Sequence, residues 1–208
     1  MSKTVKIKNI AIGGGNKIAV QSMTNTDTLD IEATSDQLKR LQLVGCDIAR
    51  IAVSSDAEVE ACKSYIGKFD IPLVADIQFD YRLAVKCAEI GFDKIRFNPG
   101  NIGDENKVKF TVDACKAHGV PIRIGVNTGS LEKEFIGMKK SDALVSSAFK
   151  HVRILEKFGF YDIVISVKSS DVKTTVDAYR KIASQVDYPL HLGVTESGAD
   201  ERGIVRSA

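Results

Sequence analysis

The sequence predicts an α/β fold of the TIM (β/α)8-barrel type, and two observations lead to this class. Short β-branched runs alternate with amphipathic helical segments along almost the whole chain, mostly at intervals of roughly 22 to 28 residues. Such alternation is typical of parallel strands with helical crossovers, which form an open doubly wound sheet or a barrel. No G-x-G-x-x-G motif follows a strand, so the barrel is favoured over a dinucleotide-binding sheet.

The segment before the first barrel strand is expected to form a β-hairpin. VKIKNIAIGGGNKIAV has two extended arms, and its three glycines suggest the turn between them. A phosphate-binding glycine loop is disfavoured because a strand, not a helix, follows these glycines. We therefore divide the chain into an N-terminal hairpin at 1–17 and a barrel domain at 18–208, with the hairpin closing the bottom of the barrel.

Seven segments have the length and composition of buried strands. In order they are IAVQSM (18–23), DIARIAV (47–53), IPLVADI (71–77), DKIRFN (93–98), PIRIGVN (121–127), DIVISVK (162–168) and LHLGVTE (190–196). The eighth strand of a closed barrel is missing, which leaves unpaired backbone groups along a gap. We therefore expect a truncated barrel that belongs to a longer polypeptide or is completed by another chain.

The segments between these strands have the period and the punctuation of helices. Apolar residues line one face of each helix ahead of Gly45, Gly91 and Gly159, which are expected to end helices. Ser141 and Ser170 are expected as N-caps.

Composition excludes several classes of partner. The chain has 29 Lys+Arg and 27 Asp+Glu, a formal charge of +2, and no block of like charge. A nucleic-acid or membrane footprint is therefore not expected. The N-terminus has no apolar signal-peptide core, and no stretch approaches the roughly 18 apolar residues of a membrane span. These features predict a cytoplasmic protein.

Cysteine and histidine spacing predicts no metal site. The four cysteines contain no C-x-x-C pair and have no histidine at metal-ligand spacing. Cys62, Cys87 and Cys115 fall in helical segments and are expected to be small buried thiols. His118 and His151 also fall on helices and are expected at the surface.

Three arginines interrupt apolar strand segments, and this is the strongest functional signal. Arg50, Arg96 and Arg123 lie within strands, and Lys168 ends another. A ring of these four cations at one barrel mouth repels itself unless a multiply negative ligand lies at its centre, and a phosphate or diphosphate suits guanidinium groups. The alternative, in which each arginine pairs with a barrel carboxylate such as Asp47, Asp76 or Asp93 or points outwards between helices, stays open.

Further polar side chains follow the same strands at their carboxyl ends, where the active sites of α/β barrels form. Asp76 and Gln78 end the third strand, and Glu196 ends the seventh. Asn98 shares a strand face with Arg96, and Asn127 shares one with Arg123 and Gly125.

Six motifs in order make the sequence resemble a known family. They are VQSMTNTDT, VADIQFDYRLA, KIRFNPGNIG, PIRIGVNTGSLE, SVKSSDV and HLGVTESG. From about Val5 to its last residue, the chain resembles the barrel domain of the 4-hydroxy-3-methylbut-2-enyl diphosphate synthases of non-mevalonate isoprenoid biosynthesis. The resemblance implies reductive ring opening of 2-C-methyl-D-erythritol 2,4-cyclodiphosphate, with uptake of two electrons and loss of water.

The resemblance also implies roles for the residues singled out above. The residues implied to bind substrate are Arg50, Arg96, Asn98, Arg123, Asn127, Lys168 and Gln78, and those implied in catalysis are Glu196 and Asp76. The Asp76 carboxylate would orient neighbouring groups, and Glu196 would donate or relay a proton. Gln78 stands where the family commonly has a histidine, so only a hydrogen bond is expected from it.

The resemblance further implies a [4Fe-4S] cluster in the complete enzyme, held by three cysteines and a glutamate of a second domain whose ligands are not in this chain. The electron donor would be a flavodoxin, a ferredoxin or another reductant, and bacterial members would be cytoplasmic homodimers. Because the redox chemistry belongs to the cofactor, this chain alone is expected to bind substrate without turning it over.

Two other functions stay open. A pterin-binding barrel of the dihydropteroate synthase or corrinoid methyltransferase type has similar architecture and strand-end Asp and Asn residues, but it leaves four cations unexplained. A non-catalytic phosphate-binding scaffold is the alternative outside the enzymes.

Overall fold

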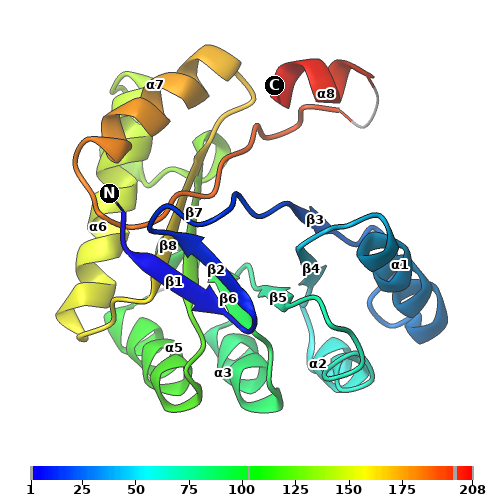
Figure 1. Ribbon diagram of the computed structural model, residues 1–208. Coiled ribbons are helices and arrows are strands. Elements are labelled where there is room, and N and C mark those ends of the chain that lie inside the picture. Colours follow the sequence, from blue (N-terminus) through cyan, green and yellow to red (C-terminus); the bar gives the residue numbers. More distant parts are fainter. Residues whose placement is uncertain (1, 103, 199–200, 208) are drawn as a thin grey trace.

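The computed structural model describes residues 2–102, 104–198 and 201–207, and its centre is one sheet of six parallel strands (Figure 1). The strands are β3 (Gln21–Met23), β4 (Ile48–Ala52), β5 (Leu73–Asp76), β6 (Lys94–Phe97), β7 (Ile122–Asn127) and β8 (Ile163–Lys168). Each strand pairs with its successor in the chain. A doubly wound sheet reverses its strand order, so this unbroken sequence identifies the arrangement as part of a barrel.

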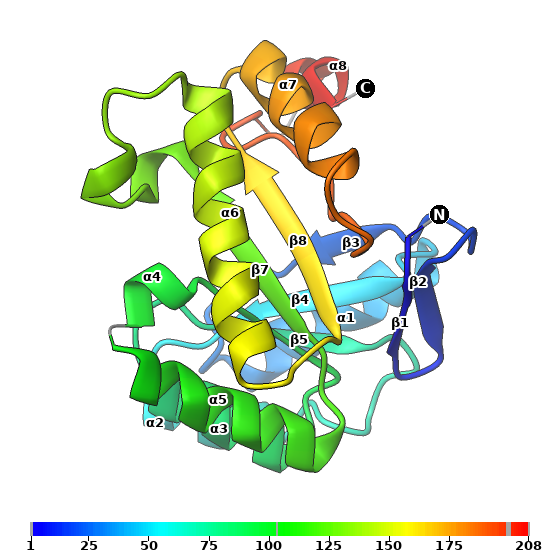
Figure 2. The same cartoon turned by 90° about the vertical axis from the view of Figure 1, so that its left-hand side faces the viewer.

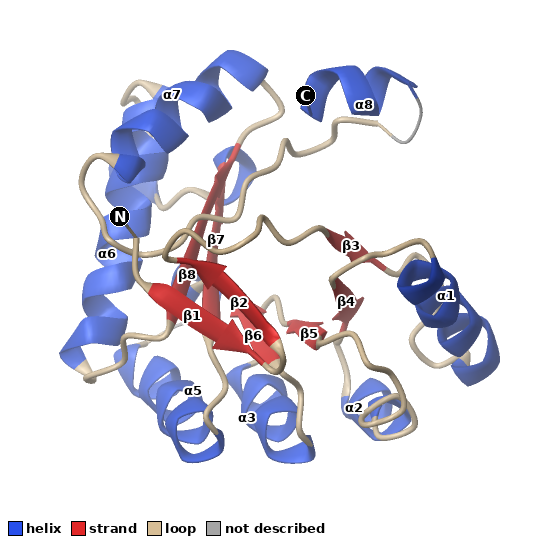
Figure 3. Cartoon of the chain, viewed as in Figure 1, coloured by secondary structure: helices blue, strands red, loops and turns tan. Residues whose placement is uncertain are grey.

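Helices cover the outer face of the sheet as an arc (Figures 1 and 3). They are α1 (Ile31–Leu43), α2 (Asp56–Cys62), α3 (Tyr81–Ile90), α5 (Glu105–His118), α6 (Lys140–Lys157) and α7 (Val172–Ala183). The remaining helical segments are α4 (Pro99–Ile102), α8 (Glu201–Ser207) and the 3-10 turns η1 (Thr128–Ser130) and η2 (Lys133–Phe135). No helix within the described ranges is long and apolar enough to cross a membrane.

Helix ends follow the expected punctuation in part. Gly91 is the left-handed C-cap of α3 at φ 100°, as expected. The prediction that Ser141 and Ser170 are N-caps is wrong. Asp171 caps α7 by accepting the Thr174 N–H, because the carboxylate one residue later reaches the first turn, and Ser141 lies buried inside α6.

The strands bury alternate residues against the helices. Ile95, Phe97, Ile122 and Ile124 belong to the large apolar core, which also contains Cys62, Cys87 and Cys115. The three cysteines are free buried thiols, as expected. Because side chains alternate along a strand, the residues between these positions face the hollow of the half-barrel.

The N-terminal hairpin is confirmed, but its turn is not where the glycines are. β1 (Thr4–Ile7) pairs with β2 (Ile10–Gly13), and Ile7 lies opposite Ile10. The turn is therefore Lys8 and Asn9, with Lys8 at φ 53°, because a two-residue connection fits this register. Gly13 ends the second strand, and Gly14 and Gly15 follow it, so none of the three glycines joins the two strands.

The hairpin closes the amino-terminal end of the half-barrel. Ile7 packs with Ile48 and Val74 in a separate buried cluster, which Ile10 and Ile12 border. Figure 2 shows the hairpin across the end where the parallel strands begin. The expectation that it closes the bottom of the barrel is confirmed.

The sheet contains six parallel strands in the described ranges, and the seventh expected strand, LHLGVTE, does not form. Only one bridge, between Leu190 and Ile165, continues the sheet. The phenol of Tyr179 occupies the next position, where it accepts the Val167 N–H (3.3 Å) and donates to the His191 carbonyl (2.5 Å). The architecture is therefore a half-barrel, since a helix side chain takes the hydrogen bonds that a longer ladder needs.

Candidate functional site

Five cationic side chains face the hollow of the half-barrel. They are Arg50 of β4, Lys94 and Arg96 of β6, Arg123 of β7 and Lys168 of β8. The strand register places Arg96 beside Arg123, and the positive charges of Arg50 and Arg96 lower the pKa of both Arg123 and Lys168. The structure therefore brings together the four predicted cations and adds Lys94.

One carboxylate serves two of these arginines. Asp76 ends β5, and its Oδ1 lies 2.7 Å from Nη1 of Arg96 while its Oδ2 lies 3.5 Å from Nε of Arg50. Arg50 also donates to the sulfur of Met23 at 3.0 and 3.2 Å. Asp76 thus joins β4, β5 and β6 at the mouth.

Two other strand carboxylates expected as possible partners of the arginines, Asp47 and Asp93, bind backbone instead. Asp47 accepts the Val20 N–H at 2.8 Å, and Asp93 accepts the Leu73 N–H at 2.8 Å. Both bonds fix backbone at the start of strands. The alternative of pairing with a barrel carboxylate therefore holds for Arg50 and Arg96, which share Asp76, and not for Arg123 among the described residues.

Arg123 is the most constrained of the cations. It is 2% exposed, and its Nε and Nη1 have no hydrogen-bond partner among the described residues. Burial, followed by repulsion from Arg50 and Arg96, lowers the pKa of Arg123 to about 9. Unsatisfied buried donors cost roughly 1–3 kcal/mol each, and more when charged, so these groups point to an acceptor brought by a ligand.

Two glycines make room for cationic side chains. A Cβ at position 125 would lie 2.7 Å from Nε of Arg96, and one at position 193 would lie 2.8 Å from Nζ of Lys168. Side chains do not approach so closely, so both positions need glycine for the site to keep this shape.

The two asparagines lie at the carboxyl end, as expected, and the hydrogen bonds of their side chains go to residues in the segments that follow the strands. Asn98 is buried, and its Oδ1 accepts the Gly100 N–H at 3.1 Å. Oδ1 of Asn127 accepts a long hydrogen bond (3.5 Å) from the Thr195 hydroxyl. Asn127 thereby links the end of β7 to the residue just before Glu196.

Glu196 and Gln78 lie at the same end of the half-barrel. The backbone of Glu196 is left-handed, at φ 56°, which is unusual for a residue other than glycine. Such strain is found most often at functional sites. Gln78 is exposed just after β5, and no described contact joins it to the converging cations.

His151 contradicts the expectation of a surface histidine. Its side chain is fully buried, and its Nε2 lies 2.7 Å from Oε1 of Glu132, whose Oε2 accepts from Ser147. Burial would raise the pKa of Glu132, but the hydrogen bonds from His151 and Ser147 outweigh it and hold this pKa at about 2. Because Gly100 packs on the pair, the loops after β6 and β7 are both anchored to α6.

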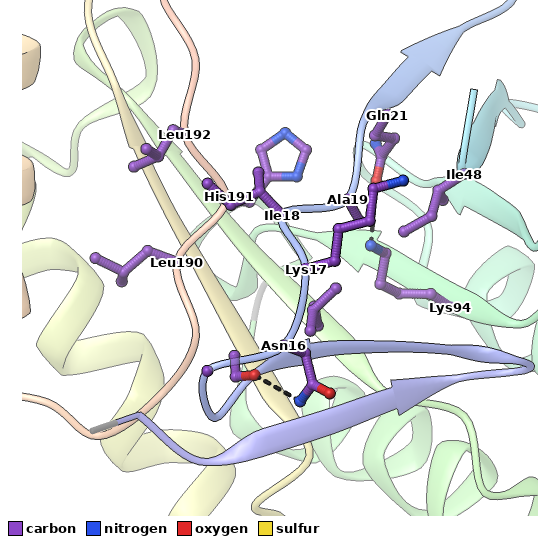
Figure 4. Close-up of a pocket in the computed structure, with 13 residues that line it drawn as sticks. Asn16, Lys17, Ile18, Ala19, Gln21, Ile48, Lys94, Leu190, His191 and Leu192 are labelled. Atoms are coloured by element: carbon purple, nitrogen blue, oxygen red, sulfur yellow. Dashed lines mark hydrogen bonds between the residues drawn. The ribbon is translucent and has the colours of Figure 1, made fainter. Parts of the chain in front are cut away.

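A pocket of about 350 Å³ lies at the amino-terminal side of the half-barrel (Figure 4). The segments 12–21 and 190–192 form its walls, and Ile48 and Lys94 come from the sheet. Figure 4 shows the hydrogen bond that Nζ of Lys94 donates to Oε1 of Gln21, whose length is 3.1 Å. The pocket is not at the strand ends where Asp76 and the arginines meet, so we place the functional site at those ends.

Sequence comparisons relate the chain to one family. The model of the GcpE TIM-barrel domain matches residues 2–208. The chain is 56% identical to a 4-hydroxy-3-methylbut-2-en-1-yl diphosphate synthase (flavodoxin) of Caldanaerobacter subterraneus subsp. tengcongensis, covering 100% of this chain and 59% of that protein. It is 53% identical to the protein of the same name from Fusobacterium nucleatum, again over 100% and 59%. The chain thus spans about three fifths of the length of these curated relatives.

Structural comparisons agree on the fold. A Yersinia pestis dihydropteroate synthase superposes with a TM-score of 0.71 at 12% identity, covering 98% of this chain and 84% of that one. The dihydropteroate synthase of Thermus thermophilus, in complex with 6HMPPP, gives 0.62 at 13% identity, covering 99% and 86%. At such low identity, the likeness concerns the barrel fold alone.

Proposed function

Because the chain belongs to the GcpE TIM-barrel domain family, we propose that it forms the substrate-binding barrel of a 4-hydroxy-3-methylbut-2-en-1-yl diphosphate synthase. Its substrate would be 2-C-methyl-D-erythritol 2,4-cyclodiphosphate, opened reductively in non-mevalonate isoprenoid biosynthesis. The observation that carries this proposal is the excess of positive charge: five buried or half-buried cations face the hollow, and within the described residues Asp76 is the one carboxylate that pairs with any of them, namely with Arg50 and Arg96. A diphosphate supplies both the negative charge and the hydrogen-bond acceptors that this mouth lacks.

Each site residue has a task in this proposal. The residues proposed to hold the substrate are Arg50, Arg96, Asn98, Arg123, Asn127, Lys168 and Gln78. The unsatisfied Nε and Nη1 of Arg123 would donate to diphosphate oxygens, and Asp76 would keep Arg50 and Arg96 turned toward them. Glu196 would donate a proton to the carbon skeleton, from a backbone held in a strained conformation.

The four cysteines of this chain do not fit an iron-sulfur cluster. All are buried, and burial raises the pKa of the Cys62 and Cys115 thiols to about 12. A cluster needs thiolates, which this environment disfavours. No group of three or more possible metal ligands gathers within the described residues. We therefore assign binding and orientation to these residues, and a [4Fe-4S] cluster, supplying the electrons, to ligands outside this set.

The partners follow from the relatives. Their name specifies flavodoxin, so we propose a flavodoxin as the electron donor. The bacterial origin of these relatives favours the cytoplasm of a bacterium, and we retain a homodimer as the proposed assembly of the complete enzyme.

A thermal-shift titration tests the proposed ligand. The cyclodiphosphate should raise the melting temperature of the purified protein in a concentration-dependent way, whereas a phosphate-free pterin should not. Arg153→Ala changes an exposed arginine on α6 and should leave the rise unchanged. A shift with the pterin alone would favour the pterin-binding alternative. Stoichiometric iron and reductive activity in the 208-residue chain would contradict the assignment of redox chemistry to other residues.

A further inference from the structure

We propose that anion binding at the mouth of the half-barrel is coupled to proton uptake by Lys94 and Lys168. The inference rests on the proposed function, because it concerns the charge state in which the same site receives a diphosphate. Both lysines are neutral amines in a large fraction of the ligand-free molecules near pH 8, and become ammonium groups when the anion arrives.

Lys94 lies in surroundings that disfavour an ammonium group. It is 1% exposed, and its hydrogen-bond partner in the described ranges is the neutral side-chain amide of Gln21, at 3.1 Å. Asp76, which lies on β5 two residues beyond the Val74 that pairs with Lys94, already binds two arginines. An amide oxygen compensates only part of the cost of burying a charge.

The elements packed around Lys94, other than β5 and the apolar hairpin, each place a cation or a neutral polar group near its amine. These groups are Gln21 of β3, Arg50 of β4, Arg96 of β6, Arg123 of β7, His191 after α7, and Lys17, which is paired with Asp47. β5 contributes Val74 opposite Lys94, with Asp76 two residues further on. The local charge around this amine is therefore positive.

Lys168 faces the same hollow two strands away, at the carboxyl end of β8, whereas Lys94 begins β6. It ends β8 opposite Asn127, and its side chain runs along Gly193. Arg123, Arg50 and Arg96 repel its positive charge, and Asp76 alone attracts it. No described carboxylate forms an ion pair with Lys168 or Lys94, so the two lysines share the same deficit.

The direction of the titration agrees with this geometry. Burial, followed by the neighbouring arginines, lowers the pKa of Lys94 and of Lys168 to about 7. His191 does not relieve the deficit, because burial and the same cations lower its pKa as well and keep it neutral. A bound diphosphate reverses the sign of the local field, so it should raise both lysine pKa values toward the ordinary 10.4 or so.

Linkage gives the coupling a measurable size. At pH 8, binding should take up as much as about one proton per lysine, because each amine passes from mostly neutral to mostly charged. Affinity should therefore fall as pH rises from 7.5 to 9, by up to about tenfold per pH unit for each lysine.

Calorimetry with methyl diphosphate measures this uptake. The last ionisation of this probe lies near pH 6, so it exchanges few protons of its own at pH 8. Binding enthalpies in HEPES and in Tris should differ by the number of protons taken up multiplied by the difference in buffer ionisation enthalpy. We expect one to two protons per site in the unmodified protein.

Single variants assign the protons. Lys94→Met and Lys168→Met should each remove about half of the uptake, while Lys63→Met, which changes an exposed lysine paired with Glu60, should remove none. Lys94→Gln serves the same purpose if the methionine variant does not fold. Binding without proton uptake overturns this inference and leaves the proposed function standing. Absence of binding at pH 7.5 overturns the proposed function itself.

Discussion

The two ends of the half-barrel use the same strands for opposite purposes. At the amino-terminal end, Ile48 of β4 and Val74 of β5 pack under the hairpin as an apolar plug. Two residues further along the same strands, Arg50 and Asp76 form an ion pair that faces the mouth. One step of the strand repeat, about 6.6 Å, therefore separates apolar packing from concentrated charge.

Along the strands, the residues that stabilise the fold are therefore separated from those assigned to ligand binding. The plug excludes water and binds the hairpin to the sheet, whereas the charged layer above it carries unsatisfied donors and mutual repulsion. Such a layer is a cost to the folded chain, and a ligand at the mouth offsets it. Changes at the two ends should thus have different signatures in binding and in unfolding experiments.

The largest expected effect is at the charged end. Arg96→Ala and Arg123→Ala should each weaken methyl diphosphate binding by about 2–5 kcal/mol, because each removes a desolvated partner of the anion. Calorimetric Kd values measure this loss, with Arg153→Ala as the control on the helix surface. Kd values close to that of the unmodified protein would mean that both arginines have a structural role, and that the charged end is not the binding site.

The apolar end should show the reverse pattern. Ile48→Ala leaves a cavity beneath the hairpin and should lower the free energy of unfolding by about 2–4 kcal/mol. Binding of methyl diphosphate to the folded variant should stay within about twofold of the unmodified protein. Arg50→Ala, on the same strand two residues away, is the matched opposite. A large change in Kd for Ile48→Ala would show that the two layers are not independent.

A methyl group at a glycine tests the shape of the charged end. Gly125→Ala places Cβ 2.7 Å from Nε of Arg96, so the guanidinium must move, and binding should weaken by about 1–3 kcal/mol. Gly129→Ala is the matched control, since nothing lies within 4 Å of a Cβ there. Equal Kd values for the two variants would mean that Arg96 adapts without loss.

Sequence reasoning found the charged end because its signal is local. Arginine inside an apolar run is anomalous on any strand, and Arg50, Arg96 and Arg123 each show it. Lys94 was missed because it follows Asp93 at the start of a strand, where a lysine looks like an ordinary solvent-exposed boundary residue. Its place beside Arg96 on the inner face, two residues along, was the available signal.

The hairpin turn and the two N-caps were misplaced by local residues, whereas two further errors concern partners that are distant in sequence. His151 lies three residues after Ala148 and four before Leu155, so helical spacing already placed it on the buried face of α6, and the residue type misled the prediction; its partner Glu132 comes from the loop after β7. The LHLGVTE segment has the alternation of a strand, yet Tyr179 takes the hydrogen bonds that would extend its ladder. Neither periodicity nor residue type specifies what a loop or a neighbouring helix brings to these positions.

The smallest expected effect links the two ends through Lys94, which lies between the plug and the mouth. Its pKa is lowered to about 7, so between pH 7 and pH 8.5 the unfolded chain binds the proton that the folded chain has released. Stability should therefore rise with pH across this window, and Lys94 should contribute about 1.6 kcal/mol of the rise. Urea unfolding of the unmodified protein and of Lys94→Met at both pH values measures the difference. An identical rise in the two proteins would mean that Lys94 keeps its proton in the folded state, and that the boundary between the two ends carries a permanent charge.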